Sequence, residues 1–176
     1  MPYLLPRHPT PALRLPLSGG GTYELGLEKP REFTMLVFYR GLHCPICKMQ
    51  LHELETKLNE FGKRGIDVVA ISTDDQAKAD RTKSEWGLPA LKVAYDLKLE
   101  EARKWGLFVS AGKPGSNEPA FFTEPAIFLI RPDKTLYFAS VQTMPFARPR
   151  LADILSAIDF VQAENYPARG EVPPAG

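Results

Sequence analysis

Apolar residues follow two different spacings along this 176-residue chain. Nearly continuous apolar runs at 33–39 and 66–72 are typical of buried strands. Between these runs, apolar positions recur at alternating steps of four and three, which predicts the buried stripe of a helix ending at Gly62. The stripe consists of Cys47, Leu51, Leu54, Leu58 and Phe61.

The same alternation of strand and helix continues toward the C-terminus. Thr73-Asp74-Asp75 supplies capping side chains for a polar helix that runs to about Trp86. The other predicted elements are a strand at 91–95, a helix at 97–105, an exposed loop at 113–117, two strands at 126–130 and 135–140 joined by a turn, and a last helix with Leu151, Ile154, Leu155, Ile158 and Val161 on one face.

The two ends of the chain have a different character. An irregular, proline-containing arm at 1–11 precedes a β-hairpin, predicted from apolar segments on either side of the Ser-Gly-Gly-Gly turn at 18–21. A Pro/Gly-rich tail is predicted at 167–176. No repeat or linker divides residues 1–176, so we expect one α/β domain: a central mixed β-sheet flanked by helices, with an N-terminal β-hairpin extension.

The hydrophobic content and the net charge of the chain argue against several functional classes. A hydrophobic content of 44% suffices for one core without structural disulfides. The formal net charge is +1 and no basic run is present, which argues against nucleic-acid or membrane-surface partners. The sequence shows no secretory-signal pattern and no apolar stretch of transmembrane length, so a cytoplasmic location is expected.

The strongest chemical feature is Cys44-Pro45-Ile46-Cys47, which contains the only two cysteines. Two thiols at this spacing, between a strand and a helix, are typical of a redox-active pair. With Pro45 as the first helical residue, Cys44 becomes the N-cap, and its thiolate is stabilised by free amides and the helix dipole. Arg40 and His43 are nearby candidate cations. Because Cys47 lies in the buried stripe, Cys44 is predicted to attack and Cys47 to resolve the product.

Other interpretations of these residues remain open. The cysteines could form a zinc site with His43 and His52, but no second cysteine pair exists and His52 lies off the cysteine face, so no metal or other cofactor is predicted. They could also be inert core thiols. His43 could be a solvated neighbour of the motif without a chemical role. Arg40 follows a buried strand, where a charged side chain is unusual, and this favours a functional role for it.

The segment 38–47, Phe-Tyr-Arg-Gly-Leu-His-Cys-Pro-Ile-Cys, resembles the active site of the peroxiredoxin-like branch of the alkyl hydroperoxide reductase and thiol-specific antioxidant (AhpC/TSA) family. The likeness extends over most of the chain, through 70–75, 85–89, 94–96, 125–133 and 165–170. This resemblance implies a thioredoxin-like fold.

The resemblance leaves two ways to align the cysteines. Typical peroxiredoxins hold the peroxide with a proline, a threonine or serine three residues before the peroxidatic cysteine, and a distant arginine. In that alignment Arg40 replaces the proline, Cys44 replaces the threonine and Cys47 is peroxidatic. In a thioredoxin alignment Cys44 is the nucleophile, and we favour it because the helix stripe buries Cys47.

Aligning the late strand at 126–130 places Pro125 where typical peroxiredoxins have the distant arginine. Pro125 then resembles the cis-proline that faces the CxxC of thioredoxins, although it could be an ordinary strand-entry proline. Glu124 precedes it, and a carboxylate near the thiols would raise a thiol pKa, an effect that Arg40 would offset.

These features predict a thiol-dependent oxidoreductase that cycles Cys44 and Cys47 between dithiol and disulfide and reduces hydroperoxides as an antioxidant. The alternatives are a thioredoxin-like protein disulfide reductase and a non-enzymatic redox sensor. The implied partners are a hydroperoxide or disulfide substrate and a thiol electron donor such as thioredoxin or glutathione. Peroxiredoxin relatives often pair, so a homodimer is conceivable, but the sequence identifies no pairing surface.

Overall fold

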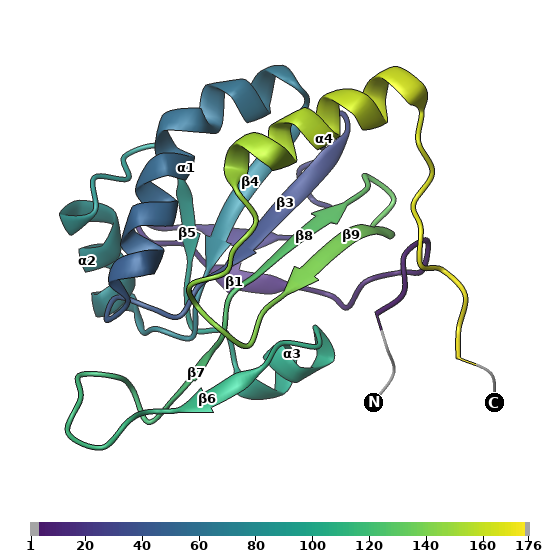
Figure 1. Cartoon of the computed structure of the whole chain (residues 1–176). Coiled ribbons are helices and arrows are strands. Elements are labelled where there is room, and N and C mark those ends of the chain that lie inside the picture. Colours follow the sequence, from purple (N-terminus) through teal and green to yellow (C-terminus); the bar gives the residue numbers. More distant parts are fainter. Residues whose placement is uncertain (1–3, 175–176) are drawn as a thin grey trace.

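The structure, a computed structural model, describes residues 4–174 and is built around a five-stranded mixed sheet (Figure 1). The strand order is β5-β4-β3-β8-β9, in which β3, β4 and β5 are parallel and β8 and β9 run antiparallel to their neighbours. The bounds are β3 Phe33–Phe38, β4 Ile66–Ile71, β5 Lys92–Ala94, β8 Ala126–Ile130 and β9 Leu136–Val141. The predicted mixed sheet is confirmed.

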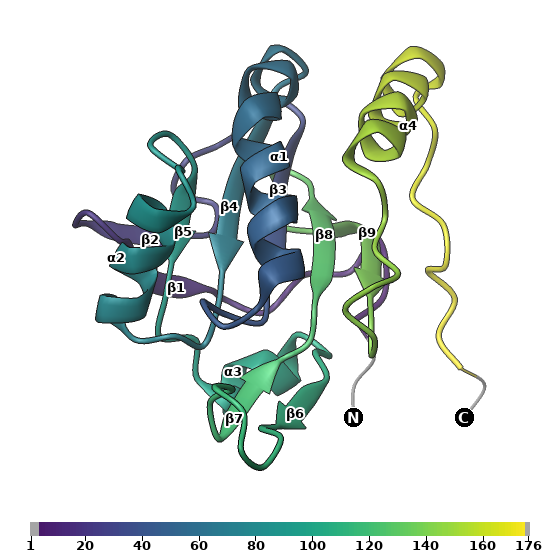
Figure 2. The ribbon, with the colours of Figure 1, turned by 60° about the vertical axis from the view of Figure 1, so that its left-hand side comes forward.

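Helices and the N-terminal hairpin cover the two faces of this sheet (Figures 1 and 2). Side chains of α1 (Pro45–Lys63), α2 (Gln76–Glu85) and α4 (Leu151–Glu164) pack in one core layer. The opposite layer contains α3 (Leu99–Lys104) and the hairpin of β1 (Arg14–Pro16) and β2 (Thr22–Glu24). Within residues 4–174, no helix combines the length and the apolar character needed to cross a membrane.

Strand β3 shows why both faces had to be covered. All six of its residues are buried, and they alternate between the two layers: Met35 and Val37 contact the α1 side, whereas Leu36 and Phe38 contact the other. Because β3 is the central strand, its C-terminal end leads directly into the segment that carries the cysteines.

Helix α1 forms largely as its residue pattern predicts. Pro45 is its first residue, where the missing N–H costs nothing, and Cys44 is the N-cap. The stripe is buried at Cys47, Leu51, Leu54 and Phe61, with Leu58 partly buried. The helix extends to Lys63, one residue past the predicted end at Gly62.

A second small hairpin was not predicted. Its strands, β6 (Val109–Ala111) and β7 (Phe121–Thr123), pair antiparallel outside the main sheet and flank the predicted loop at 113–117. The strands have three residues each, and most of β6 is partly exposed, so no alternating pattern marks them in the sequence. This hairpin lies below the main sheet in Figure 2, at the end where α1 begins.

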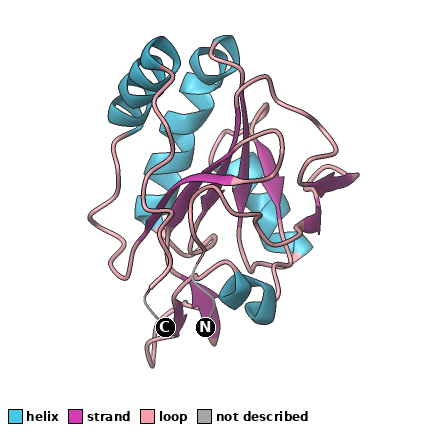
Figure 3. Ribbon diagram, turned by 90° about the vertical axis from the view of Figure 1, so that its right-hand side faces the viewer, coloured by secondary structure: helices cyan, strands magenta, loops and turns pink. Residues whose placement is uncertain are grey.

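The C-terminal segment after α4 runs as a loop beside the sheet (Figures 1 and 3). The Tyr137 hydroxyl donates a hydrogen bond to the Tyr166 carbonyl (2.9 Å), and Arg7 Nε donates to the Ala168 carbonyl (3.1 Å). Ala168 is buried, so the start of the predicted tail packs against the domain. Residues 1–3 of the predicted arm and 175–176 of the tail lie outside the described part of the chain.

Candidate active site

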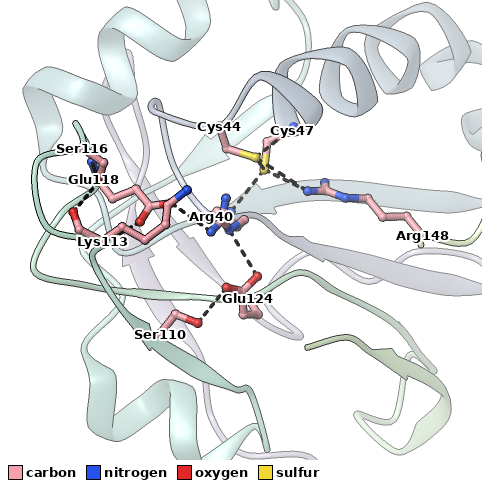
Figure 4. A network of polar contacts seen from close by, with 9 residues as sticks. All are labelled: Arg40, Cys44, Cys47, Ser110, Lys113, Ser116, Glu118, Glu124 and Arg148. Atoms are coloured by element: carbon pink, nitrogen blue, oxygen red, sulfur yellow. Dashed lines mark hydrogen bonds and ion pairs between the residues drawn. The ribbon is translucent and has the colours of Figure 1, made fainter. Parts of the chain in front are cut away.

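The two cysteines lie where β3 passes into α1, with their sulfurs adjacent (Figure 4). Both are free thiols, and the Cys47 thiol donates to the Cys44 sulfur over 2.6 Å. The Cys47 backbone N–H also donates to Cys44 Sγ (3.2 Å), which is the cap contact that the Pro45 position implies. A disulfide therefore requires little movement of either residue.

The surroundings shift the pKa values of the two thiols in opposite directions. The pKa of Cys44 is lowered to about 5, chiefly by the hydrogen bond from the Cys47 thiol and further by the Cys47 backbone N–H and by Arg148, against the opposing effect of burial. The pKa of Cys47 is raised, first by burial and then by its hydrogen bond to Cys44. Near neutral pH the pair is a Cys44 thiolate beside a Cys47 thiol.

Arg40, at the end of β3, is held by two carboxylates. Its Nη2 lies 3.3 Å from Glu118 Oε1 and its Nε lies 3.2 Å from Glu124 Oε2, while its guanidinium stacks 4.6 Å from the Phe122 ring centroid. Its backbone N–H donates to Cys47 Sγ (3.4 Å), and the side chain contributes to lowering the Cys44 pKa. The geometry thus brings together Arg40 and Glu124, as the sequence predicted, and adds Glu118.

The unpredicted β6–β7 hairpin supplies most of this support (Figure 4). Glu118 lies in its loop and also accepts the Lys113 backbone N–H (2.8 Å). Ser110 on β6 donates to Glu124 Oε1 over 2.7 Å. Because Glu124 is only 4% exposed, its negative charge is balanced chiefly by Arg40.

His43 is not the cation that the sequence suggested. Burial, with help from the charge of Arg40, lowers its pKa to about 4, so the ring is neutral at neutral pH. The imidazole packs edge-on against Phe122, with ring centroids 4.7 Å apart. The prediction that a positively charged His43 stabilises the Cys44 thiolate is therefore wrong.

The cation that sequence reasoning missed is Arg148. Its Nη2 lies 3.2 Å from Cys47 Sγ and 3.8 Å from Cys44 Sγ. The side chain is fixed by the Pro145 carbonyl and by Gln50 Oε1, each 2.6 Å away. Figure 4 shows Arg40 and Arg148 approaching the sulfurs from different sides. Nothing local marks Arg148 in the sequence, because the contact joins residues 104 positions apart.

Pro125 differs from the thioredoxin-like expectation. No peptide bond among residues 4–174 is cis, so the predicted cis-proline is wrong. Pro125 is buried at the entry to β8, and its carbonyl accepts the Gln142 backbone N–H (3.0 Å). This position agrees with the alternative interpretation, an ordinary strand-entry proline.

A cavity of about 450 Å³, which we call the dithiol cavity, opens beside the N-terminus of α1. Cys44 contributes to its lining and Cys47 does not, although only 1% of Cys44 is exposed. The lining includes the apolar side chains of Ile46 and Phe146, and also Arg40, His43 and residues in the loop of the β6–β7 hairpin. An incoming molecule therefore meets Cys44 first.

The zinc alternative gains no support from the geometry. His52 Nδ1 lies 3.1 Å from the Trp86 carbonyl oxygen rather than near the sulfurs. Among residues 4–174, no group of three or more His, Cys, Asp or Glu side chains is arranged to hold a metal ion.

Comparison with known families settles the family. A sequence profile described as the AhpC/TSA family matches residues 6–139. The chain belongs to the AhpC/TSA family. No match was found among curated proteins.

Solved structures show the same fold at low sequence identity. Peroxiredoxin 6 of Arenicola marina is 22% identical, with a TM-score of 0.75 over 93% of this chain and 76% of that one. Peroxidoxin BcpB of Mycobacterium tuberculosis is 18% identical, with a TM-score of 0.70 over 92% of this chain and 98% of that one. The 2-Cys peroxiredoxin of Plasmodium vivax is 16% identical, with a TM-score of 0.75 over 93% and 100%. The thioredoxin-like fold is thereby established for this AhpC/TSA protein.

Proposed function

We propose that this AhpC/TSA protein is a thiol-dependent peroxidase in which Cys44 attacks a hydroperoxide and Cys47 resolves the product. The observation that carries the proposal is the asymmetry of the pair. Cys44 has a pKa of about 5 and lines the dithiol cavity, whereas Cys47 is a buried thiol 2.6 Å behind it. A nucleophile needs both ionisation and access, and only Cys44 has both.

The proposed cycle balances with two thiols and one peroxide. The Cys44 thiolate gives its electron pair to the terminal peroxide oxygen, the O–O bond breaks, and the leaving alkoxide takes up a proton to form an alcohol. The resulting Cys44 sulfenic acid is attacked by the Cys47 sulfur, which releases water and forms the disulfide. A thiol donor of the thioredoxin or glutathione type then returns both cysteines to the reduced state, as a reducing compartment such as the cytoplasm would allow.

Two arginines support the first step. Arg148 and Arg40 both help to keep Cys44 ionised. A guanidinium this close to the sulfur would also stabilise the negative charge that develops on the peroxide oxygens. In this proposal they replace the distant arginine of typical peroxiredoxins, at whose position this chain has Pro125.

A protein disulfide reductase is the second candidate, because apolar side chains line part of the dithiol cavity and one of them, Phe146, is 74% exposed. A redox sensor would use the same pair without turnover. Rapid mixing of the reduced protein with hydrogen peroxide separates these functions: thiol loss much faster than in free cysteine supports the peroxidase, and a rate equal to free cysteine excludes it. Reduction of insulin disulfides with dithiothreitol as the electron source would favour the reductase instead.

Single-thiol variants test the roles of the cysteines. Cys47→Ser should still react with peroxide and then form a trapped mixed disulfide with an added thiol. Cys44→Ser should lose the fast reaction. If the Cys44→Ser protein is the faster of the two, Cys47 is the peroxidatic cysteine, and the typical peroxiredoxin alignment is correct.

A further inference from the structure

The side chain of Arg148 lies closer to Cys47 than to Cys44 (Figure 4). Its Nη2 is 3.2 Å from Cys47 Sγ and 3.8 Å from Cys44 Sγ. The backbone N–H of Arg40 also donates to Cys47 Sγ, over 3.4 Å. Cys47 is fully buried, yet in the resting pair it is the uncharged thiol. The resting pair therefore does not explain why a cation and a second donor lie beside this sulfur.

The guanidinium of Arg148 is fixed independently of the thiols. It donates to the Pro145 carbonyl and to Gln50 Oε1, each over 2.6 Å, and neither group changes when the sulfurs are oxidised or reduced. Among residues 4–174, Arg148 lies in no ion pair with a carboxylate, whereas Arg40 contacts two. The positive charge of Arg148 is therefore available to the sulfurs at every stage of the cycle.

Two steps of the proposed cycle need a negative charge on Cys47. In the first, the Cys47 thiolate forms the S–S bond with the Cys44 sulfenic acid, and the departing hydroxide leaves as water with the proton that Cys47 gave up. In the second, a donor thiolate attacks the disulfide. Only Cys44 of the pair lines the dithiol cavity, so the donor sulfur bonds to Cys44, and the electron pair of the broken S–S bond goes to Cys47.

The reduction is completed by a second thiol. This thiol attacks the donor sulfur in the mixed disulfide, which frees the Cys44 thiolate and releases the donor as its own disulfide. The Cys47 thiolate takes up a proton from water, and the resting pair is restored.

We propose that Arg148 is catalytic at Cys47, where it stabilises the thiolate first as the resolving nucleophile and again as the leaving group when the disulfide is reduced. This inference rests on the proposed cycle through a Cys44–Cys47 disulfide. In both steps Cys44 is bonded to oxygen or to another sulfur, so it is no longer a thiolate. The guanidinium then has one developing negative charge beside it, on Cys47.

The causes of the Cys47 pKa shift agree with this role. Burial raises the pKa of Cys47 most, and Cys44 raises it further through its hydrogen bond and its negative charge, whereas Arg148 lowers it. Once Cys44 has lost its negative charge, the effect of that charge on Cys47 disappears and the effect of Arg148 remains. Cys47 therefore becomes easier to ionise at the two steps that require it.

The rate at which each cysteine leaves a disulfide tests the role of Arg148. Dithiothreitol reduction of the Cys44–Cys47 disulfide, formed with diamide, expels Cys47. Dithiothreitol reduction of Cys47→Ser that carries 2-mercaptoethanol on Cys44 expels Cys44 instead, because the more acidic thiol leaves faster. Acid quenching, alkylation of the free thiols and mass spectrometry follow both reactions.

Arg148→Gln should slow the two reactions unequally. A nearby cation lowers the pKa of an acid by about 1–3 units, and one unit in thiol pKa alters exchange rates about threefold. Cys47 is the nearer sulfur and does not line the cavity, so its release should slow at least about tenfold, and the release of Cys44 about threefold. Arg148→Lys keeps the charge and should recover part of the Cys47 rate.

Two further variants separate this role from a structural one. Arg150→Gln removes a nearby exposed arginine and should change neither rate. Gln50→Met removes the Oε1 anchor of Arg148 and keeps a side chain of similar length. It should slow Cys47 release more than Cys44 release, by a smaller factor than Arg148→Gln. If Arg148→Gln fails to fold, the selectivity of Gln50→Met decides.

The failures are distinguishable. Equal slowing of both reactions, or no slowing of either, would overturn the role of Arg148 at Cys47 and leave the peroxidase function standing. Selective slowing of Cys47 release, in a protein that reacts with hydrogen peroxide no faster than free cysteine, would overturn the peroxidase function alone. Failure of diamide to form the Cys44–Cys47 disulfide would overturn both.

Discussion

At the scale of single residues, the acidity of Cys44 depends on groups from three different parts of the chain. Its neighbour in the helix, Cys47, makes the largest contribution, through its thiol and its backbone N–H. Arg40 comes from the end of β3 and Arg148 from the segment before α4. Each adds a donor to the thiolate, and such donors favour the charged form.

The pH dependence of the reaction follows from the pKa of Cys44. Because this pKa is lowered to about 5, the thiolate persists until the pH falls through that value. The rate of reaction with hydrogen peroxide should therefore be nearly constant from about pH 6.5 to 8 and fall about tenfold for each unit well below pH 5. Stopped-flow measurement across this range provides the check, and a midpoint near pH 8 or above would contradict it. Cys44→Ser, which leaves only Cys47, should react only as the pH becomes alkaline.

Removing the charge of Arg148 should raise the pKa of Cys44. A hydrogen bond to a charged group contributes about 1.5–3 kcal/mol when buried, and Arg148 is shared by two sulfurs and partly exposed, so Arg148→Gln should raise the pKa by roughly one unit. The thiolate absorbance would show this directly. The peroxide rate should fall at every pH, because the charge that stabilises the peroxide oxygens is lost, and it should fall severalfold more at pH 5 than at pH 8. Arg150→Gln removes a nearby exposed arginine and should leave the titration where it is. An unchanged titration in Arg148→Gln would show that its contact with the sulfurs is incidental.

At the scale of elements, the junction between β3 and α1 determines where the thiols lie. The chain leaves β3 at Phe38, and the Leu42 backbone N–H donates to Asp74 Oδ2 over 2.8 Å. Asp74 is itself buried, three residues after the end of the neighbouring strand β4. The two parallel strands therefore fix the segment that enters α1, as is common at the carboxyl ends of parallel strands.

Gly41 lies at this junction, where a side chain would not fit. Its φ of +131° is strained for other residues, and an added Cβ would lie 2.8 Å from Asp74 Oδ1. Gly41→Ala should therefore lower the free energy of unfolding by about 1–3 kcal/mol and slow the peroxide reaction. Urea denaturation measures the first effect.

Gly62 offers a matched control for this change. It lies within α1 on an ordinary helical backbone, and an added Cβ there would have no atom within 4 Å. Gly62→Ala should raise the stability by roughly 0.5–1 kcal/mol. Equal stability changes of one sign in both variants would contradict the role assigned to the β3–α1 junction.

At the scale of the whole molecule, the reactive pair and much of the stabilising core lie on different faces of the sheet. Phe128 on β8 packs edge-on against Phe38 and Trp105, with ring centroids 5.6 and 5.4 Å apart, in the layer that contains α3 and the N-terminal hairpin. Cys44 and Cys47 belong to the other layer, with α1 and α4. Stability and reactivity should therefore respond to different substitutions.

Phe128→Ala tests this separation. Phe128 is 1% exposed, so its truncation should lower the free energy of unfolding by about 3–5 kcal/mol. The Cys44 titration should stay within a few tenths of a unit, because no contact to the sulfurs is lost. Phe160→Ala makes the same change where the ring is 57% exposed, and its effect should be below about 1 kcal/mol. A large shift of the Cys44 titration in Phe128→Ala would show that the two layers are coupled.

Much of the fold was predictable because its determinants are local. The apolar runs at 33–39 and 66–72 became β3 and β4, and the four-and-three spacing became the buried side of α1. The position of Pro45 predicted Cys44 as the N-cap, which the structure confirms. The hairpin of β6 and β7 was not predicted, because its short, half-exposed strands carry no periodic pattern of apolar residues.

By itself, the sequence determined the order of the helices and of the five strands of the main sheet, the place of the CxxC at the start of α1, and a resemblance to the AhpC/TSA family that its profile match confirms. Only the tertiary structure decided the charges around the sulfurs: Arg148 arrives from another segment, and burial makes His43 neutral. Strand and helix patterns follow from neighbouring residues in the chain. The pKa of a thiol depends instead on which charges and donors lie within a few ångströms, and folding brings those from distant positions.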